Sequence, residues 1–262
     1  MNSISLDLSS AISSNHNALT TKFGELASGQ RSSSEHSPAL LQIGERLLNQ
    51  AKRSNMANQN IQSAMSRSHT VDACLADTND SITRLKELAV RSGDGTMTDA
   101  DRESLNTEAQ EIIKHISLNN RTANYNGKEI LQGGDVKVAV SPDGESVSLS
   151  TPDLSLSELG LDDLDLRDMS NIDQAIESLD AAGEKVSQHR STLGAEQNMM
   201  KHRYGANMDA EVALREAGSK QVDTDFARAL TEMSSAGVRS NIAIAVQAQG
   251  TKILSSAMAT LL

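Results

Sequence analysis

The chain has 262 residues, and 24 Lys and Arg against 35 Asp and Glu give it a formal net charge of −11. This acidity argues against general nucleic-acid binding, which requires a basic face, and two Tyr and two Phe are too few aromatics to line a large apolar ligand pocket. No run of 18 apolar residues predicts a membrane span, and the N-terminus lacks the basic and apolar regions of a secretory signal.

The first 30 residues predict an amphipathic helix. They contain only three charged side chains, those of Asp7, Lys22 and Glu25. Pro38, which follows, should interrupt any helix that continues from this segment. The apolar residues recur at helical spacing and are Ile4, Leu8, Ile12, Leu19, Phe23 and Leu26.

A long second helix is predicted from Glu45 to Ser92, a stretch with neither Gly nor Pro. Gly93 and Gly95 should end it. Heptad positions predict a coiled-coil-like seam, whose small and polar members favour close packing against several neighbours. One column is Leu40, Leu47, Ser54, Ile61, Ser68, Leu75, Ile82 and Ala89, and the other is Ile43, Gln50, Ala57, Ala64, Val71, Thr78 and Leu85.

A third helix is predicted over 99–118. Thr98 is its expected N-cap, with Asp99 and Asp101 in the first turn, where acidic side chains are favoured. A turn is predicted at Asn124, Asn126 and Gly127.

A β-hairpin is predicted near 136–150. Val136, Val138 and Val140 alternate with other residues, as do Val147 and Leu149, and Pro142-Asp143-Gly144 lies between them. Residues 141–170 contain eight acidic residues and one base, Arg167. We therefore expect this small segment on the outer surface.

Residues 171–262 contain no Pro and predict further helices. The apolar spacing is roughly helical from Ile172 to Met208 and becomes irregular near Gly218. Gly237 and Gly250 should weaken the last helical region locally. Its apolar residues are Phe226, Leu230, Met233, Ile242, Val246, Ile253 and Leu261.

The two ends share a depletion of charge, since residues 237–262 carry only Arg239 and Lys252. A lone helix with an apolar stripe is marginal in water. The ends are therefore expected to bury their stripes against each other, and their uncharged remainder against further copies of the chain. An ordinary intramolecular bundle is the alternative. The predicted fold class is mainly α: an elongated antiparallel coiled-coil-like helical bundle with a small β-hairpin.

Six blocks in order resemble bacterial flagellin, the subunit of the flagellar filament. Residues 25–31 (ELASGQR) resemble the family's RLSSGLR, 85–92 (LKELAVRS) its VRELAVQS, and 125–131 (YNGKEIL) its FNGVKVL. Residues 190–198 (RSTLGAEQN) are similar to RSDLGAVQN, 223–227 (DTDFA) to DSDYA, and 247–249 (QAQ) to QAN. The chain departs from the family at residues 32–39, which replace its INSAKDDAAG connector, and it lacks the large outermost domains of many flagellins.

The resemblance implies an inner terminal-helix domain, the filament core, over 1–38 and 224–262. It implies a rod domain over 39–223 that carries the hairpin. The implied function is a structural, non-enzymatic subunit that polymerises into the extracellular flagellar filament for swimming motility. The residues expected to pack the filament core are the apolar sets given above for the two ends, Ile4 to Leu26 and Phe226 to Leu261.

The resemblance also implies export through the flagellar secretion channel without a cleaved signal peptide. The implied partners are identical copies, an export chaperone and a filament cap, with no nucleic acid and no membrane. Two other functions stay open. A hook–filament junction protein has similar terminal helices, and a secreted helical binding module would be a stable monomer with both ends ordered.

Two surface sites are further hypotheses. Arg84, Leu88 and Glu108 align with rod residues that contact the innate immune receptor in flagellins that it senses. Leu88 also lies beside the helical seam, so simple packing is the alternative. O-glycosylation is a hypothesis for four hydroxyl residues of the segment expected at the surface, Ser146, Ser148, Ser150 and Thr151.

No catalytic, cofactor or metal site is expected. None of the six His lies in an HExxH spacing, and no GxSxG motif occurs. The acids Asp162, Asp163, Asp165 and Asp168 lack the glycine and closing Glu of an EF-hand loop. Cys74, the single cysteine, is interpreted as a small apolar group on the rod helix, with a redox thiol as the alternative.

Overall fold

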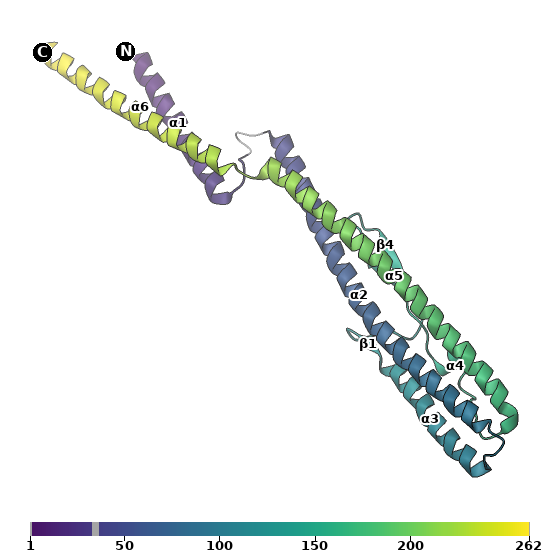
Figure 1. Cartoon of the computed structure of the whole chain (residues 1–262). Coiled ribbons are helices and arrows are strands. Elements are labelled where there is room, and N and C mark those ends of the chain that lie inside the picture. Colours follow the sequence, from purple (N-terminus) through teal and green to yellow (C-terminus); the bar gives the residue numbers. More distant parts are fainter. Residues whose placement is uncertain (1, 33–36, 262) are drawn as a thin grey trace. The chain divides into compact units, whose positions relative to one another are not determined.

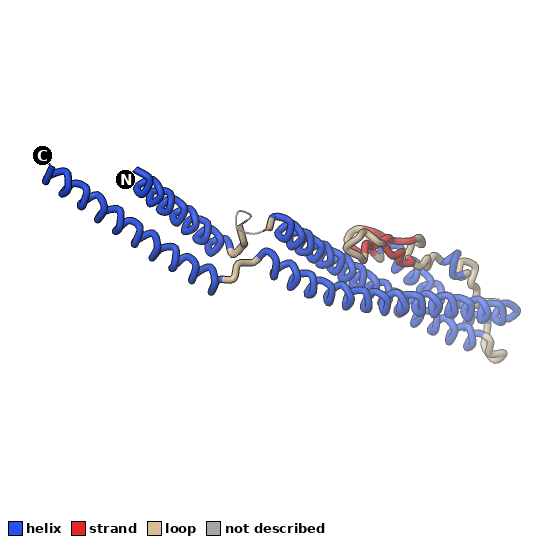
Figure 2. The backbone as a smooth tube through the Cα atoms, turned by 90° about the horizontal axis from the view of Figure 1, so that it is seen from above, coloured by secondary structure: helices blue, strands red, loops and turns tan. Residues whose placement is uncertain are grey.

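The computed structural model in Figure 1 describes the backbone of residues 2–32 and 37–261, and side chains within 9–32, 37–253 and 255–256. It contains two compact units, Met1–Ala51 with Val212–Leu262 and Lys52–Glu211. Helices dominate both units (Figure 2), which confirms the predicted mainly α class. The predicted domain division at residues 38 and 224 falls where helices are interrupted rather than at the borders of these units, and it stays a prediction.

The first unit is built on the pairing of α1 (Asn2–Ser28) with α6 (Phe226–Leu261), which lie side by side in Figures 1 and 2. The small residues Ala229 and Ala236 of α6 are buried in this unit. Among the described residues, the two terminal segments thus pack against each other as the sequence predicted.

Main-chain hydrogen bonds join the segment that follows α1 to the segment that precedes α6. The chain leaves α1 through Gly29, whose φ of +71° is a conformation that glycine adopts without strain. Gln30 then forms an antiparallel bridge with Asp223, and the Arg31 N–H donates to the Val222 carbonyl at 2.8 Å.

We call the segments 29–32 and 222–225 the junction. Helix α2 (Pro38–Ser92) begins near it, and helix α5 (Ile172–Val222) ends there. Pro38 is the first residue of α2, where its missing N–H costs the helix no bond. It therefore lies at a helix interruption, as predicted. Each of the two helices has a glycine where they approach closely, Gly44 on α2 and Gly218 on α5. A Cβ on Gly218 would lie 3.1 Å from the Gly44 carbonyl oxygen.

The predicted seam of α2 is buried in the second unit. All heptad positions from Ser54 to Ala89 are at most 5 % exposed, whereas Leu40 and Ile43 at the start of the helix are 49 % and 40 % exposed. On α5, the predicted apolar positions from Ile172 to Met200 that face this core include Leu179, Val186 and Leu193.

The acidic segment after the hairpin is not simply a surface loop, so this expectation was wrong in part. Asp162 and Asp163 are exposed as expected, but leucines between the acids enter the main core together with residues of α2, α3 (Asp99–Thr122) and α5. The short helix α4 (Leu156–Leu159) and a 3₁₀ turn (Met169–Asn171) shape this segment. Its buried leucines are Leu154, Leu159, Leu161, Leu164 and Leu166.

The start of α3 follows the sequence prediction. Thr98 caps the helix by accepting a bond from the Asp101 N–H, and its own N–H donates to the Asp101 carboxylate at 3.0 Å. The two residues thus form a reciprocal capping box.

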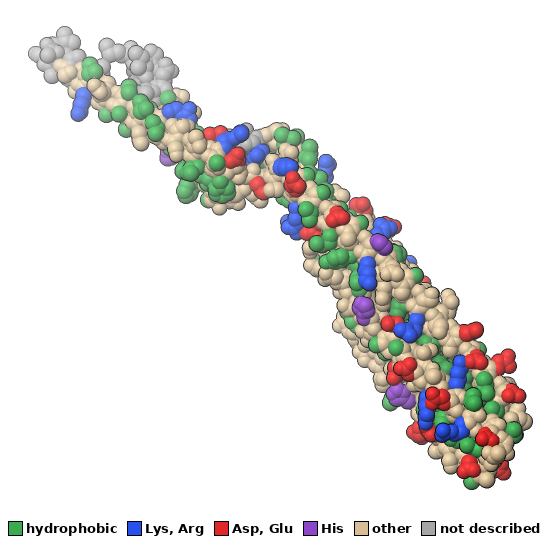
Figure 3. Space-filling model, viewed as in Figure 1, with side chains coloured by type: hydrophobic (Ala, Val, Ile, Leu, Met, Phe, Trp, Pro, Cys, Tyr) green, Lys and Arg blue, Asp and Glu red, His purple; other side chains and the backbone are tan. Residues whose placement is uncertain are grey.

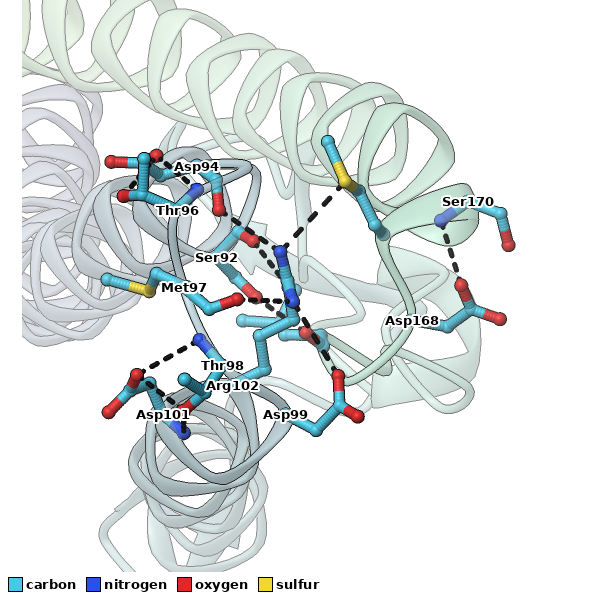
Figure 4. A network of polar contacts seen from close by, with 12 residues as sticks. Ser92, Asp94, Thr96, Met97, Thr98, Asp99, Asp101, Arg102, Asp168 and Ser170 are labelled. Carbon is cyan, nitrogen blue, oxygen red and sulfur yellow. Dashed lines mark hydrogen bonds and ion pairs between the residues drawn. The ribbon is translucent and has the colours of Figure 1, made fainter.

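A buried arginine joins α3 to the end of α2 (Figure 4). Arg102 is 7 % exposed and donates three bonds to main-chain carbonyls of the connection. Its Nε bonds Ser92 at 3.0 Å, Nη1 bonds Met97 at 3.0 Å, and Nη2 bonds Asp94 at 3.1 Å. Because the last carbonyls of a helix have no partner within it, Arg102 satisfies a group that α2 leaves open.

Two small antiparallel hairpins complete the second unit. β1 (Asn124–Tyr125) and β2 (Lys128–Glu129) are joined by Asn126 and Gly127, both with positive φ, at the predicted turn. β3 (Asp135–Ala139) pairs with β4 (Ser146–Ser150) in the register Lys137 opposite Ser148, which confirms the predicted hairpin.

Candidate assembly surface

Two charged residues of α1, Lys22 and Glu25, form ion pairs within the first unit. Lys22 and Glu25 are 7 % and 3 % exposed. The Lys22 ammonium lies 3.1 Å from the Glu25 carboxylate and 3.0 Å from that of Glu232 on α6, and the Glu25 carboxylate also accepts the Ser32 N–H at 2.7 Å. These charge-assisted bonds fix the pairing of the two helices. Sequence reasoning noted both charges but did not foresee their burial.

The outer surface of α6 is apolar on more than one side. It carries four charged residues in 36, Arg228, Glu232, Arg239 and Lys252. Large apolar side chains lie at successive i, i+4 positions and also between them, and Figure 3 shows hydrophobic side chains at the surface over this helix pair. A helix that is apolar on several sides is normally buried. The exposed members from residue 238 onward are Val238 (58 %), Ile242 (57 %), Ile244 (52 %), Val246 (54 %) and Ile253 (62 %).

A second exposed group lies at the end of the helix pair nearer the junction. Phe23 on α1 is 67 % exposed, and Phe226 and Leu230 on α6 are 58 % and 54 % exposed. Contiguous apolar surface of this kind typically marks a protein–protein contact.

The predicted filament-core residues therefore divide into three groups. Phe23, Phe226, Leu230, Ile242, Val246 and Ile253 are exposed, and Ile12, Leu19, Leu26 and Met233 are half-buried. The side chains of Ile4, Leu8 and Leu261 lie outside the described residues. Intermolecular packing of this set stays a prediction.

The three residues of the receptor hypothesis are not equally accessible. The Arg84 guanidinium bonds Glu108 at 2.7 Å and Glu87 at 2.9 Å, and these bonds raise its pKa. Arg84 and Glu108 are about half exposed, but Leu88 is 1 % exposed and belongs to the main core. A partner at the folded surface can therefore contact Arg84 and Glu108 but not Leu88.

The four hydroxyl residues of the glycosylation hypothesis also differ. Ser146 and Ser148 are exposed, and Ser150 is partly buried. Thr151 is 7 % exposed, and its hydroxyl accepts a bond from Arg67 at 2.6 Å. Only the first two are open to a modifying enzyme.

The polar groups weighed for other chemistry have local roles. Asp165 pairs with Arg167 at 2.8 Å, and bonds from this guanidinium lower the pKa of the carboxyl. Desolvation raises the pKa of the half-buried Cys74 thiol, with the charge of Asp77 acting in the same direction.

Among the described residues, no three His, Cys, Asp or Glu side chains are grouped to hold a metal ion. Within the same part of the chain, no helix is long and apolar enough to cross a membrane.

Two family profiles match the chain. One is described as the bacterial flagellin N-terminal helical region and covers residues 1–135, and the other as the bacterial flagellin C-terminal helical region and covers residues 169–256. A flagellin from Halalkalibacterium halodurans is 29 % identical over 80 % of this chain and 79 % of its own length. The phase 1 flagellin of Salmonella naestved is 28 % identical over 62 % of this chain, which spans 32 % of that longer protein.

Solved structures share the fold. The crystal structure of Bacillus cereus flagellin has a TM-score of 0.52 and 27 % identity, covering 57 % of this chain and 88 % of that one. A putative flagellar hook-associated protein from Vibrio parahaemolyticus has a TM-score of 0.63 and covers 72 % of this chain and all of that one. Its identity is 14 %, so this likeness concerns the fold alone.

Proposed function

Because the chain belongs to the bacterial flagellin family, we propose that it is a structural subunit that polymerises into the flagellar filament and so serves swimming motility. The exposed apolar surface of α6 supports this proposal most directly. Burial of apolar surface contributes on the order of 25 cal/mol per Å². Neighbouring copies that cover this surface would thus add favourable free energy with every subunit.

The proposed role implies a location, an export route and two further partners. The protein acts outside the cell and has no enzymatic activity. It leaves the cell through the flagellar secretion channel without a cleaved signal peptide, with a chaperone that covers the apolar C-terminal helix and a cap that receives it at the filament end. The scarcity of charge on α6 supports the need for a chaperone, because such a helix would otherwise aggregate.

A further proposal is that the innate flagellin receptor recognises free subunits, and the half-exposed Arg84–Glu108 pair supports it. A reporter-cell assay with monomer should respond, and Arg84→Ala together with Glu108→Ala should weaken the response. Silence of the wild-type monomer would remove this proposal. O-glycosylation at Ser146 or Ser148 is tested by intact-mass measurement of filaments from the native bacterium.

A matched pair of leucines tests the assembly surface. Leu230 on α6 is 54 % exposed and Leu118 on α3 is 59 % exposed. Leu230→Ser is expected to raise the critical concentration for polymerisation, measured by sedimentation and electron microscopy, while Leu118→Ser changes it little. Equal behaviour of the two variants would contradict the assignment of the contact surface to α6.

Removal of residues 237–262 provides the stronger test. This deletion takes away most of the exposed apolar side chains of α6 and should abolish filaments while the secondary structure of Lys52–Glu211 persists. Electron microscopy of the intact protein separates the proposal from a junction protein, which should not form long filaments alone.

A further inference from the structure

The end of the β3–β4 hairpin is held by one charged side chain from each long helix. Glu196 on α5 accepts the Ser150 N–H at 2.9 Å. Arg67 on α2 donates to the hydroxyl of the next residue, Thr151, at 2.6 Å. Two adjacent residues at the end of β4 are thus tied to both helices, and all of these groups lie within Lys52–Glu211.

The Arg67 side chain is buried and that of Glu196 is half-buried, and neither is fully hydrogen-bonded among the described residues. Arg67 is 8 % exposed, and its Nη1 has no hydrogen-bond partner within the described part of the chain. The second carboxylate oxygen of Glu196 is likewise buried without a partner. Desolvation lowers the pKa of Arg67, and the negative charge of Glu196 opposes that effect, so the two charges interact through the interior.

The other attachments of the hairpin are neutral or exposed. Asn207 donates to the Val140 carbonyl at 2.8 Å, and the Arg203–Glu145 pair lies at 3.2 Å on the surface. Exposed ion pairs contribute little to stability. Beneath the hairpin lies a small apolar cluster, separate from the main core, that consists of Ile61, Ala64, Val140, Leu149 and Met200.

A buried ion pair has an asymmetric effect on stability. Removal of one partner strands the other charge in a poorly solvated place, whereas replacement of both by apolar side chains is often neutral or stabilising. Glu196 is a charged residue at a position where the similar family block RSDLGAVQN has Val.

We propose that the buried Arg67 and the half-buried Glu196 act as a single charge couple that holds the β3–β4 hairpin against α2 and α5. The hairpin opens as a local unit when either charge is lost alone, and stays closed when both are replaced together by apolar side chains. The two are positioning residues for the hairpin, and they act as one.

The test is a double-substitution cycle on the full chain with Arg67→Met, Glu196→Val and the two combined. The readout is amide exchange, by nuclear magnetic resonance, of the Val140 and Thr151 N–H groups, which bond the Glu145 and Gly134 carbonyls in the hairpin. Each single substitution should speed exchange at both amides by about 100-fold or more, and the combined variant should return to within about threefold of wild type.

The control is Arg190→Gln, which breaks a half-exposed pair of α5 with Asp72 at 3.0 Å and should leave both amides unchanged. If a single variant fails to fold but the combined variant folds with wild-type helicity, the coupling is supported equally. Independent effects that simply add in the combined variant, or single substitutions without effect on the hairpin amides, would overturn the proposal.

Discussion

At the scale of single residues, the connection between α2 and α3 depends on Arg102. Its guanidinium satisfies three carbonyls from a buried position. Arg102→Ala removes the side-chain donor of the Ser92 and Met97 carbonyls, while the Asp94 carbonyl keeps its bond from the Met97 N–H, and we expect a loss of about 3 kcal/mol in the free energy of unfolding. Urea unfolding followed by circular dichroism measures this, with Arg121→Ala as control because Arg121 is exposed on the same helix. A similar small effect of both substitutions would contradict the assigned role.

Two carboxyl groups at the connection between α2 and α3 should lower the free energy of unfolding in acid. Bonds from the hydroxyl and main chain of Thr98 lower the pKa of Asp101, and bonds from Thr96 lower that of Asp94. A carboxyl whose native pKa lies below its unfolded value contributes fully above the unfolded value, about 3.9 for Asp, and its contribution is lost as pH falls through the native pKa. Wild type should thus lose stability below about pH 4.

Asp101→Asn separates this effect from general acid unfolding. The variant lacks the titrating group, so the difference in urea midpoint between it and wild type should shrink as pH falls from 6 to 3. A difference that stays constant over this range would mean that the capping bonds do not depend on the charge of Asp101.

Much of this local structure is readable from the sequence, and the exceptions have physical causes. Thr98, Gly93 and the Asn126-Gly127 turn act through bonds to near neighbours along the chain, so their spacing suffices. The leucines between 154 and 166 were missed because they enter the core from short turns, where neither helical nor strand periodicity applies. Arg67 and Glu196 are far apart in the sequence and reach neighbouring hairpin residues, Thr151 and Ser150, only through folding.

At the scale of whole elements, the crossing of α2 and α5 requires glycine on both helices. A Cβ on Gly44 would lie 2.5 Å from the Val222 side chain, 2.9 Å from the Gln221 Cβ and 3.2 Å from the Gly218 carbonyl oxygen. The irregular apolar spacing near Gly218 therefore marks close contact between two helices rather than a helix end, since α5 continues to Val222.

Gly44→Ala tests this contact because two effects compete. Alanine gains about 1 kcal/mol in helix propensity over glycine, but overpacking a tight contact costs about 1–3 kcal/mol. We expect net destabilisation at Gly44. At Gly205, in the middle of α5, an added Cβ meets nothing within 4 Å, and Gly205→Ala should stabilise by about 1 kcal/mol. Stabilisation by both substitutions in thermal unfolding would show that the helices separate easily at Gly44.

At the scale of the whole molecule, the single chain distributes its apolar residues unevenly between its two units. Lys52–Glu211 contains the main core, in which 22 apolar residues are buried, and the hairpin cluster. The described part of α6 contributes only Ala229 and Ala236 to the buried apolar residues, leaves Met233 half-buried and exposes its other large apolar side chains. Local stability follows buried contacts, so the free chain should protect these two regions very differently.

Hydrogen exchange of free subunits and filaments compares these regions directly. In the free subunit, amides of α6 beyond residue 237 should exchange quickly, because a helix with little buried surface is marginal in water. Amides of the α2 seam between residues 61 and 89 should already be protected. Polymerisation should slow exchange in the last segment by about 100-fold or more, since every opening there then breaks contacts with neighbouring copies. Strong protection of that segment in a dilute monomer, unchanged by polymerisation, would mean that α6 completes its packing within one chain.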